Sequence, residues 1–321
     1  GNPSAGHIRR IFTPNAEDAV TYFGDVELQL GRCPACGGAG APAFEKQGFH
    51  YQTCPQCQTL FVNPRPPASS FARYYTESRS SKYWATTFYK ETAAARREKL
   101  WKPKAVQVSE LLRRYCAFHH AVVDIGGGYG LFAETMRELT GNAPVVIEPG
   151  PLLAAACREK ALQVVEKFLE DVLPQDLPES PKAFLSFELF EHLHDPQTFL
   201  QDLGRLMVAG DLFIFTTLSG TGLDIQVLWE DSKSVSPPHH LNFFNPKSIA
   251  LLLSRAGFEV LEISTPGKLD IDILANNSHL IKDRFWRTFI DLASEAERAE
   301  WQKLTSSSGW SSHMMAVCRK P

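Results

Sequence analysis

Four of the seven cysteines lie close together in two pairs with the spacing C-x-x-C. The pairs are Cys33 with Cys36 and Cys54 with Cys57, and 17 residues separate them. Each pair can direct two thiolates at one ion, and two pairs complete the tetrahedral ligand set of a structural Zn²⁺ site. Four cysteines leave no coordination position open, so the spacing predicts a structural rather than a catalytic zinc ion. Two disulfides or a redox pair are disfavoured, because the cysteine total is odd and the sequence shows no export signal.

A glycine-rich turn follows a strongly apolar segment in the middle of the chain. Residues 121–130 read AVVDIGGGYG, which predicts a buried strand, a tight loop and the start of a helix. Glycines let the backbone approach a ligand closely, and a helix N-terminus offers free N–H donors. The dinucleotide pattern G-x-G-x-x-G does not apply, because the sixth position counted from Gly126 is Leu131. Twenty residues after Gly128 comes Glu148, whose carboxylate is placed to accept hydrogen bonds from a ribose diol.

A third group of residues is rich in histidine and glutamate. Residues 187–196 read FELFEHLHDP, and residues 237–244 read PPHHLNFF. Histidine titrates near neutral pH and can act as a general base, and a glutamate beside it can orient it. We therefore take His240, His192 and Glu191 as candidate catalytic residues. The structural alternatives are that Glu191 caps the helix that follows and that His192 packs under it.

Alternating strands and helices must position these groups. Between residue 121 and the end of the chain, predicted strands alternate with helices of about 10–15 residues, which indicates βαβ units and a parallel sheet covered on both faces. Such a sheet leaves a ligand crevice at the carboxyl ends of its strands. We predict strands at residues 121–125, 143–148, 162–166, 183–187, 211–217, 258–264 and 313–320, and helices at 129–139, 151–160, 196–207 and 245–256. Upstream, residues 31–62 suggest a small all-β module, and residues 69–115 are helical with a break at Pro103.

The motifs together resemble those of class I S-adenosylmethionine-dependent methyltransferases. The pattern D-x-G-x-G-x-G at residues 124–130 resembles their first motif, and residues 187–196 resemble the E-x-L-E-H-x-x-D-P segment after their fourth strand. Residues 237–244 and AGFEV at 256–260 resemble segments before the sixth strand in one branch. Residues 33–67 resemble the N-terminal extension of bacterial zinc-ribbon methyltransferases, which are associated with surface-polysaccharide or other specialised small-molecule biosynthesis.

The resemblance implies a fold, domain bounds and a cofactor site. The implied fold is α/β, a Rossmann-like seven-stranded methyltransferase sheet with a small zinc-ribbon module and a helical lid. The implied parts are an N-terminal segment (1–30), the zinc ribbon (31–66), the helical linker or lid (67–115) and the methyltransferase domain (116–321) with an insertion at 265–312. The residues expected to bind S-adenosylmethionine are Asp124, Gly126, Gly128, Glu148, Phe168, Leu169 and Phe187. Phe168 stands where many members have an aspartate for the adenine amino group, so we expect apolar and backbone contacts to adenine, or a contact from Asp171.

Composition and charge narrow the class of acceptor. Lys plus Arg number 33 against 36 for Asp plus Glu, and residues 31–62 carry only Arg32, Glu45 and Lys46 as formal charges. This is a poor electrostatic footprint for nucleic acid. We therefore predict methyl transfer to a small molecule, a sugar, nucleotide sugar or related biosynthetic metabolite. An RNA-modifying methyltransferase that binds RNA through the ribbon is the alternative, and a non-enzymatic, metal-stabilised module is disfavoured by the intact glycine motif.

The sequence also suggests where the acceptor binds and where the protein resides. We expect the acceptor pocket to be built from residues 69–89, 219–244 and 265–312, because loops after neighbouring strands open at one sheet edge. No apolar run reaches the roughly 18 residues needed to cross a bilayer. We therefore expect a cytoplasmic protein without membrane insertion, and the sequence indicates no particular oligomeric state.

Overall fold

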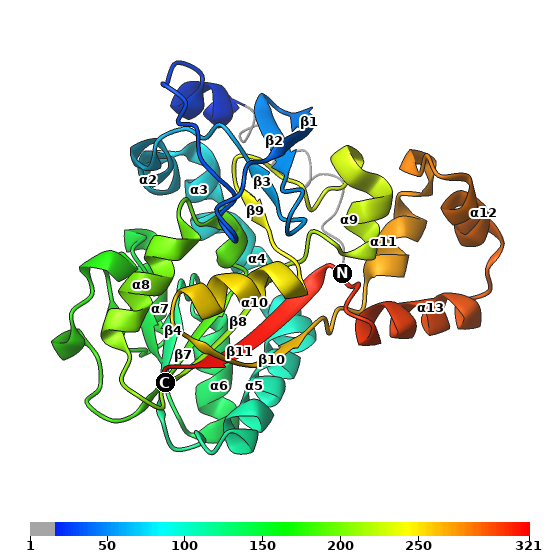
Figure 1. Cartoon of the computed structure of the whole chain (residues 1–321). Helices are drawn as coiled ribbons and strands as arrows, with labels where there is room; N and C mark the ends of the chain where they lie inside the picture. Colours follow the sequence, from blue (N-terminus) through cyan, green and yellow to red (C-terminus); the bar gives the residue numbers. More distant parts are fainter. Residues whose placement is uncertain (1–16) are drawn as a thin grey trace.

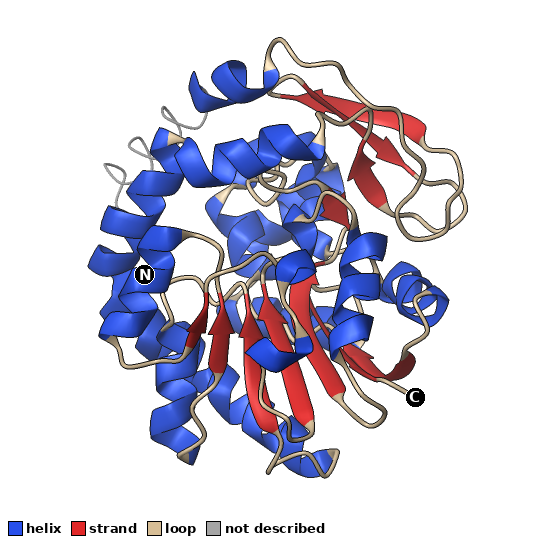
Figure 2. Cartoon of the chain, turned by 90° about the vertical axis from the view of Figure 1, so that its left-hand side faces the viewer, coloured by secondary structure: helices blue, strands red, loops and turns tan. Residues whose placement is uncertain are grey.

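A seven-stranded mixed sheet forms the centre of the computed structural model, which describes residues 17–321 (Figures 1 and 2). Of the N-terminal segment expected at residues 1–30, residues 1–16 lie outside the described part. The strands lie in the order β10-β11-β8-β7-β4-β5-β6. The five strands from β8 to β6 in this order pair in parallel, and β11 is antiparallel to both of its neighbours, β10 and β8. This topology confirms the predicted Rossmann-like α/β fold. The bounds are β4 (Ala121–Ile125), β5 (Val145–Ile147), β6 (Val164–Val165), β7 (Lys182–Phe187), β8 (Leu212–Leu218), β10 (Glu259–Ser264) and β11 (His313–Arg319).

Helices cover both faces of this sheet because its strands carry apolar side chains on both sides. Val122 and Leu185 pack with α5 and α6 on one face, and Val123 and Phe184 pack with α8 and α10 on the other. The strands and helices predicted in this part of the chain are all present, with ends that shift by one or two residues. The helix bounds are α5 (Lys102–Arg114), α6 (Leu131–Thr140), α7 (Pro151–Glu159), α8 (Pro196–Leu206) and α10 (Pro246–Arg255).

A second, four-stranded antiparallel sheet combines the predicted all-β module with a strand from much later in the chain (Figure 1). Gln47 and Gly48 connect its first two strands and both have positive φ, which a tight type I′ hairpin turn requires. The last strand, β9, follows β8 in sequence and pairs with β3. The bounds are β1 (Ala41–Lys46), β2 (Phe49–Thr53), β3 (Leu60–Val62) and β9 (Asn242–Phe243).

The segment between the two sheets is helical almost throughout. The predicted helix break at Pro103 is wrong: Pro103 lies in the first turn of α5, directly after a π-helical turn, and helical residues precede it without a gap. The run instead contains two π-helical segments, η1 and η2. The bounds are α2 (Ala68–Glu77), α3 (Arg79–Tyr83), η1 (Trp84–Phe88), α4 (Tyr89–Arg96) and η2 (Arg97–Trp101).

The long segment before the last strand forms a helical subdomain beside α9 (Figure 1). Its core joins Leu228 to Ile271, Leu274 and Ile290. Residues 285–304, an amphipathic stretch of this insertion, fall in two helices, because Ser294 caps a new helix in the middle of the stretch. The bounds are α9 (Leu223–Leu228), η6 (Trp229–Asp231), α11 (Asp270–Asn276), η7 (Ser278–Leu280), α12 (Arg284–Leu292) and α13 (Glu295–Ser307).

Three short 3₁₀ turns complete the fold: η3 (Leu169–Asp171), η4 (Pro174–Asp176) and η5 (Phe190–His192). In the part of the chain that the structure describes, we find no helix with the length and apolarity needed to cross a membrane.

Candidate active site

The glycine loop after β4 adopts a conformation that only glycine tolerates well. Gly126, Gly128 and Gly130 all have φ between +56° and +73°. A Cβ at Gly127 would lie 2.7 Å from Val146 Cγ1, so this position also excludes a side chain. The loop borders a cavity of about 130 Å³ at the carboxyl ends of β4 and β7. Glycine therefore brings bare backbone to the wall of a cavity, as the sequence predicts.

Two buried carboxylates lie beneath this loop. Glu148 Oε2 accepts a hydrogen bond from Gly128 N at 2.9 Å, and Glu148 Oε1 accepts one from Gly150 N at 2.8 Å. Asp124 is only 2% exposed, and its Oδ2 has no hydrogen-bond partner among the described residues. Burial, with the nearby carboxylate of Glu148, raises the pKa of Asp124 to about 8. An unpartnered buried acceptor at a cavity wall is suited to a ligand that brings its own donor.

The structure brings four of the seven expected cofactor residues to this cavity. Asp124, Gly126, Gly128 and Phe187 line it. Glu148 does not line the cavity, but it accepts a hydrogen bond from the N–H of Gly128, which does. Phe168 and Leu169 do not line it. Leu169 is buried in the main core, and Phe168 is 37% exposed.

Sequence analysis missed eight residues of the cavity wall, three of which come from the helical segment before β4. The guanidinium of Arg96 lies 5.4 Å from the ring centre of Tyr89 and 5.9 Å from that of Trp101, and Arg96 Nε has no hydrogen-bond partner among the described residues. In the sequence, only the position of Arg96 between Tyr89 and Trp101 in a helical segment pointed to this wall. An arginine on the solvent-exposed face of a helix would show the same pattern. The residues that line the cavity but were not predicted are Tyr89, Arg96, Trp101, Gly127, Tyr129, Leu131, Phe132 and Glu188.

The three candidate catalytic residues come together at the ends of β7 and β8. Glu191, His192 and His240 each place one potential ligand atom within 4.8 Å of the others. The rings of His192 and His240 lie 4.8 Å apart. Glu191 is 1% exposed and Thr217 Oγ1 donates to its Oε2 at 2.8 Å, so this side chain does not cap the next helix. Asp195 caps α8 instead.

Glu188 extends this group towards the cavity beside the glycine loop. It follows β7 directly and has φ of +54°, an uncommon conformation for a residue other than glycine. Its Oε1 accepts from Thr216 Oγ1 at 2.7 Å and lies 3.4 Å from His313 Nδ1. Burial raises the pKa of Glu188, but His313 and Lys104 outweigh burial and hold that pKa below its ordinary value.

Burial keeps the histidines of this region neutral. It lowers the pKa of His192 well below the usual value and, with His240 nearby, lowers the pKa of His239 to about 3. Burial also lowers the pKa of His240, although the carbonyl of Ser234 opposes this effect. Burial and the adjacent Glu188 raise the pKa of Glu191. The site therefore offers neutral imidazoles with lone pairs.

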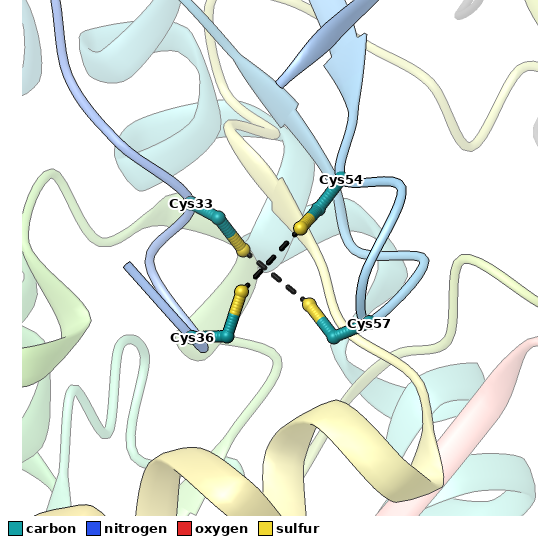
Figure 3. A group of neighbouring side chains, drawn as sticks. All are labelled: Cys33, Cys36, Cys54 and Cys57. Carbon is teal, nitrogen blue, oxygen red and sulfur yellow. Dashed lines mark hydrogen bonds between the residues drawn. The ribbon is translucent and has the colours of Figure 1, made fainter. Parts of the chain in front are cut away.

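The four paired cysteines also converge in space (Figure 3). Cys33 Sγ lies 3.4 Å from Cys57 Sγ, and Cys36 Sγ lies 3.4 Å from Cys54 Sγ, so all four thiols are free. The sulfurs are too far apart for disulfides, and four Zn–S bonds of about 2.3 Å would place them at a similar separation. The donor set and its geometry thus fit one zinc ion.

The β1–β3 module contacts the histidine cluster directly. Tyr51 Oη, on β2, donates to the carbonyl of His240 at 2.8 Å, and Val62 N donates to the carbonyl of Leu241 at 2.9 Å. The pairing of β3 with β9 holds the same segment. The position of His240 therefore depends on the module that the cysteines organise.

Two of the three segments expected to form the acceptor pocket line a hollow of about 370 Å³. Its walls come from Thr221 and α9 on one side and from Asp283, Trp286 and Trp310 on the other. The third segment, the helical linker, contacts the histidines instead: Tyr74 Oη lies 2.8 Å from His239 Nε2, and Tyr75 Oη lies 3.3 Å from His192 Nδ1.

Comparison with known families gives one match. The family model described as a methyltransferase domain matches residues 85–263, which contain the glycine loop, Glu148 and the whole Glu–His cluster. No curated protein matches the chain.

Solved structures of methyltransferases are similar at low identity. A possible histamine N-methyltransferase from Thermotoga maritima is 15% identical, with a TM-score of 0.44 over 74% of this chain and 100% of that one. Magnesium protoporphyrin IX methyltransferase from Synechocystis is 10% identical (TM-score 0.48, 79% and 100%). The plantazolicin methyltransferase BamL is 12% identical (TM-score 0.49, 77% and 93%).

Proposed function

Because the chain belongs to the class I S-adenosylmethionine-dependent methyltransferases, we propose that it binds S-adenosylmethionine beside the glycine loop and methylates a small molecule, a sugar, nucleotide sugar or related biosynthetic metabolite. The observation that carries the proposal is the pair of buried carboxylates, Asp124 and Glu148, under a glycine loop at a cavity wall. S-Adenosylmethionine supplies a methyl group already activated by its positive sulfur.

Each part of the cavity suits one part of this cofactor. Glu148 is fixed by two backbone N–H groups and would accept hydrogen bonds from the ribose hydroxyls. The unpartnered Oδ2 of Asp124 would accept from a ligand donor, and the unpartnered Nε of Arg96 would donate to the carboxylate of the methionine part. Phe168 and Leu169 remain our proposed adenine contacts, and Phe187 closes the cavity beside the glycines.

The Glu–His cluster is the proposed acceptor-activating group. The carbonyl of Ser234 can only accept, so the 2.6 Å contact to His240 Nδ1 places the ring proton on Nδ1 and leaves the Nε2 lone pair free. With an oxygen acceptor, a bond forms from that oxygen to the methyl carbon while the C–S bond breaks and leaves its electron pair on sulfur. His240 Nε2 would take the hydroxyl proton, with the carbonyl of Ser234 orienting its ring and with His192 and Glu191 beside the acceptor.

We further propose that Cys33, Cys36, Cys54 and Cys57 bind a structural zinc ion and that residues 31–66 are a zinc ribbon. The convergence of the four sulfurs supports this assignment. The charge-poor module favours a supporting role for the active site over RNA binding. The contact from Tyr51 to the carbonyl of His240 gives the ribbon a specific task, which is to position that segment.

Binding and transfer assays test the proposal together. S-Adenosylmethionine and S-adenosylhomocysteine should raise the melting temperature, because a ligand that binds only the folded state stabilises it, and NAD should not. Transfer of labelled methyl groups from S-adenosylmethionine should then be compared over pools of nucleotide sugars, glycosides and total RNA. Label in the small-molecule pools supports the proposal. Label only in RNA would establish the RNA-modifying alternative, and tight binding of NAD alone would refute the cofactor assignment.

A further inference from the structure

Glu191, His192 and His240 converge without bonding to one another. Their potential ligand atoms all lie within 4.8 Å of each other. Among the described residues, however, no hydrogen bond joins any two of these three side chains. Buried polar groups normally pair with a partner. These three side chains bond outwards, to Thr217, Tyr75 and Ser234, while one potential ligand atom of each lies close to those of the other two.

The hydrogen bonds that these three side chains make to other residues are of the kind that orients metal ligands in proteins. Ligating histidines usually donate their second ring N–H to a carbonyl or carboxylate, and ligating carboxylates are themselves hydrogen-bonded. His240 Nδ1–H donates to the carbonyl of Ser234 at 2.6 Å, which directs Nε2 away from that carbonyl. Thr217 Oγ1 donates to Glu191 Oε2 at 2.8 Å, and Tyr75 Oη lies 3.3 Å from His192 Nδ1.

We propose that Glu191, His192 and His240 bind a divalent metal ion at a second metal site, distinct from the four-cysteine site. Two imidazoles and one carboxylate form a donor set used by catalytic zinc and non-haem iron sites, and three protein ligands leave positions open for another molecule. Donor atoms around one ion at about 2.1 Å lie roughly 3–4 Å apart, so small side-chain rotations close this site on the ion.

The ion would lie at the sheet edge where the methyl group is expected, and this step rests on the proposed function. Glu188, three residues before Glu191, lines the cofactor cavity, and its partner Thr216 is adjacent to Thr217 on β8. An ion here would coordinate an oxygen of the acceptor, so we infer that the acceptor presents a hydroxyl group. Coordination would lower the pKa of that hydroxyl group so that its proton passes to water, and His240 would then bind the ion in place of the proton-accepting role proposed above.

Metal binding is tested on the full chain with its cysteine site loaded with zinc and without S-adenosylmethionine. Mn²⁺ is the probe, because imidazole–carboxylate sites accept it while thiolates prefer softer ions. The spectrum of free Mn²⁺ in paramagnetic resonance should decrease until one Mn²⁺ per chain is bound. Glu191→Gln and His240→Ala should each weaken binding by at least about tenfold, and Thr217→Val should weaken it less. His50→Ala, which changes an exposed histidine of the ribbon, should have no effect.

The outcomes separate this site from the proposed function. No Mn²⁺ binding at millimolar concentration, or equal binding by all variants, would overturn the metal site. A cooperative thermal melt in the absence of S-adenosylmethionine shows that each variant is folded. Mn²⁺ binding without methyl transfer to any hydroxylated acceptor would leave the site standing and reject the proposed function. Undiminished transfer after chelation, with one zinc per chain retained, would reject the metal site and leave His240 as the base.

Discussion

Replacing Glu148 by alanine tests the cofactor site at its best-defined point. The carboxylate accepts hydrogen bonds from Gly128 N at 2.9 Å and Gly150 N at 2.8 Å, and it is buried beside the cavity. In the variant the ribose hydroxyls would lose a charged acceptor, and the glycine loop would lose one of its supports. A hydrogen bond to a charged group contributes about 1.5–3 kcal/mol, but water can enter the space of the deleted side chain.

We therefore expect Glu148→Ala to weaken S-adenosylmethionine binding by about 1–3 kcal/mol, or about 5- to 150-fold in Kd. Glu148→Gln should have a smaller effect, because the amide keeps one acceptor oxygen but sets its NH₂ group against a backbone N–H. Calorimetric titration with S-adenosylmethionine and S-adenosylhomocysteine measures both. Glu159→Ala, at the exposed end of α7, is the matched control and should bind like the unmodified chain. If Glu148→Ala bound within twofold of this control, the ribose assignment would be refuted.

Three further predictions concern the metal, the buried aspartate and the candidate base. Cys54→Ser should abolish the content of one zinc per chain and raise hydrogen exchange in residues 31–62 while the central sheet still melts cooperatively; an unchanged zinc content, or a disulfide between Cys33 and Cys36, would contradict the zinc assignment. Because the folded chain raises the pKa of Asp124 from 3.8 to about 8, it holds a proton there that the unfolded chain releases, so this residue makes stability fall as pH rises between those values. Asp124→Asn should reduce the difference between the melting temperatures measured at about pH 6 and pH 8.5. An unchanged difference would contradict the raised pKa of Asp124. His240→Ala should lower turnover by roughly 10²–10⁴ with unchanged cofactor affinity, and normal turnover in single-turnover assays would remove His240 from the mechanism.

Local patterns in the sequence predict the central sheet well. The strand at residues 121–125 is a mostly apolar run that ends at a glycine-rich turn, and the C-x-x-C spacing of the cysteine pairs predicts that their thiols converge. The strand depends on residues that are neighbours in the sequence, and the cysteine site depends on a single type of ligand, the cysteine thiolate. They are therefore visible without knowledge of the distant contacts.

The features that sequence analysis missed depend on contacts between distant segments. β9 has only two residues, too few for any periodicity, and exists because β3 offers it an unpaired edge. Arg96 and Tyr89 reach the cavity because π-helical turns on either side of α4 shift the helical faces from their regular positions. Phe168 was assigned by counting along a motif; it does not line this cavity, and its contact with adenine stays a prediction.

The contact between the ribbon and the His240 segment sets an order in which the protein can be assembled. Tyr51 and the residue whose carbonyl it contacts, His240, lie 189 positions apart in the chain. During synthesis the ribbon emerges first, and the edge of β3 then stays unpaired until residue 243 has left the ribosome. An open strand edge is a site for pairing with other chains, so the nascent protein is most prone to aggregation in that interval. Early zinc binding would shorten the time during which the rest of the ribbon is unfolded. The edge of β3, however, is paired only when β9 has been synthesised.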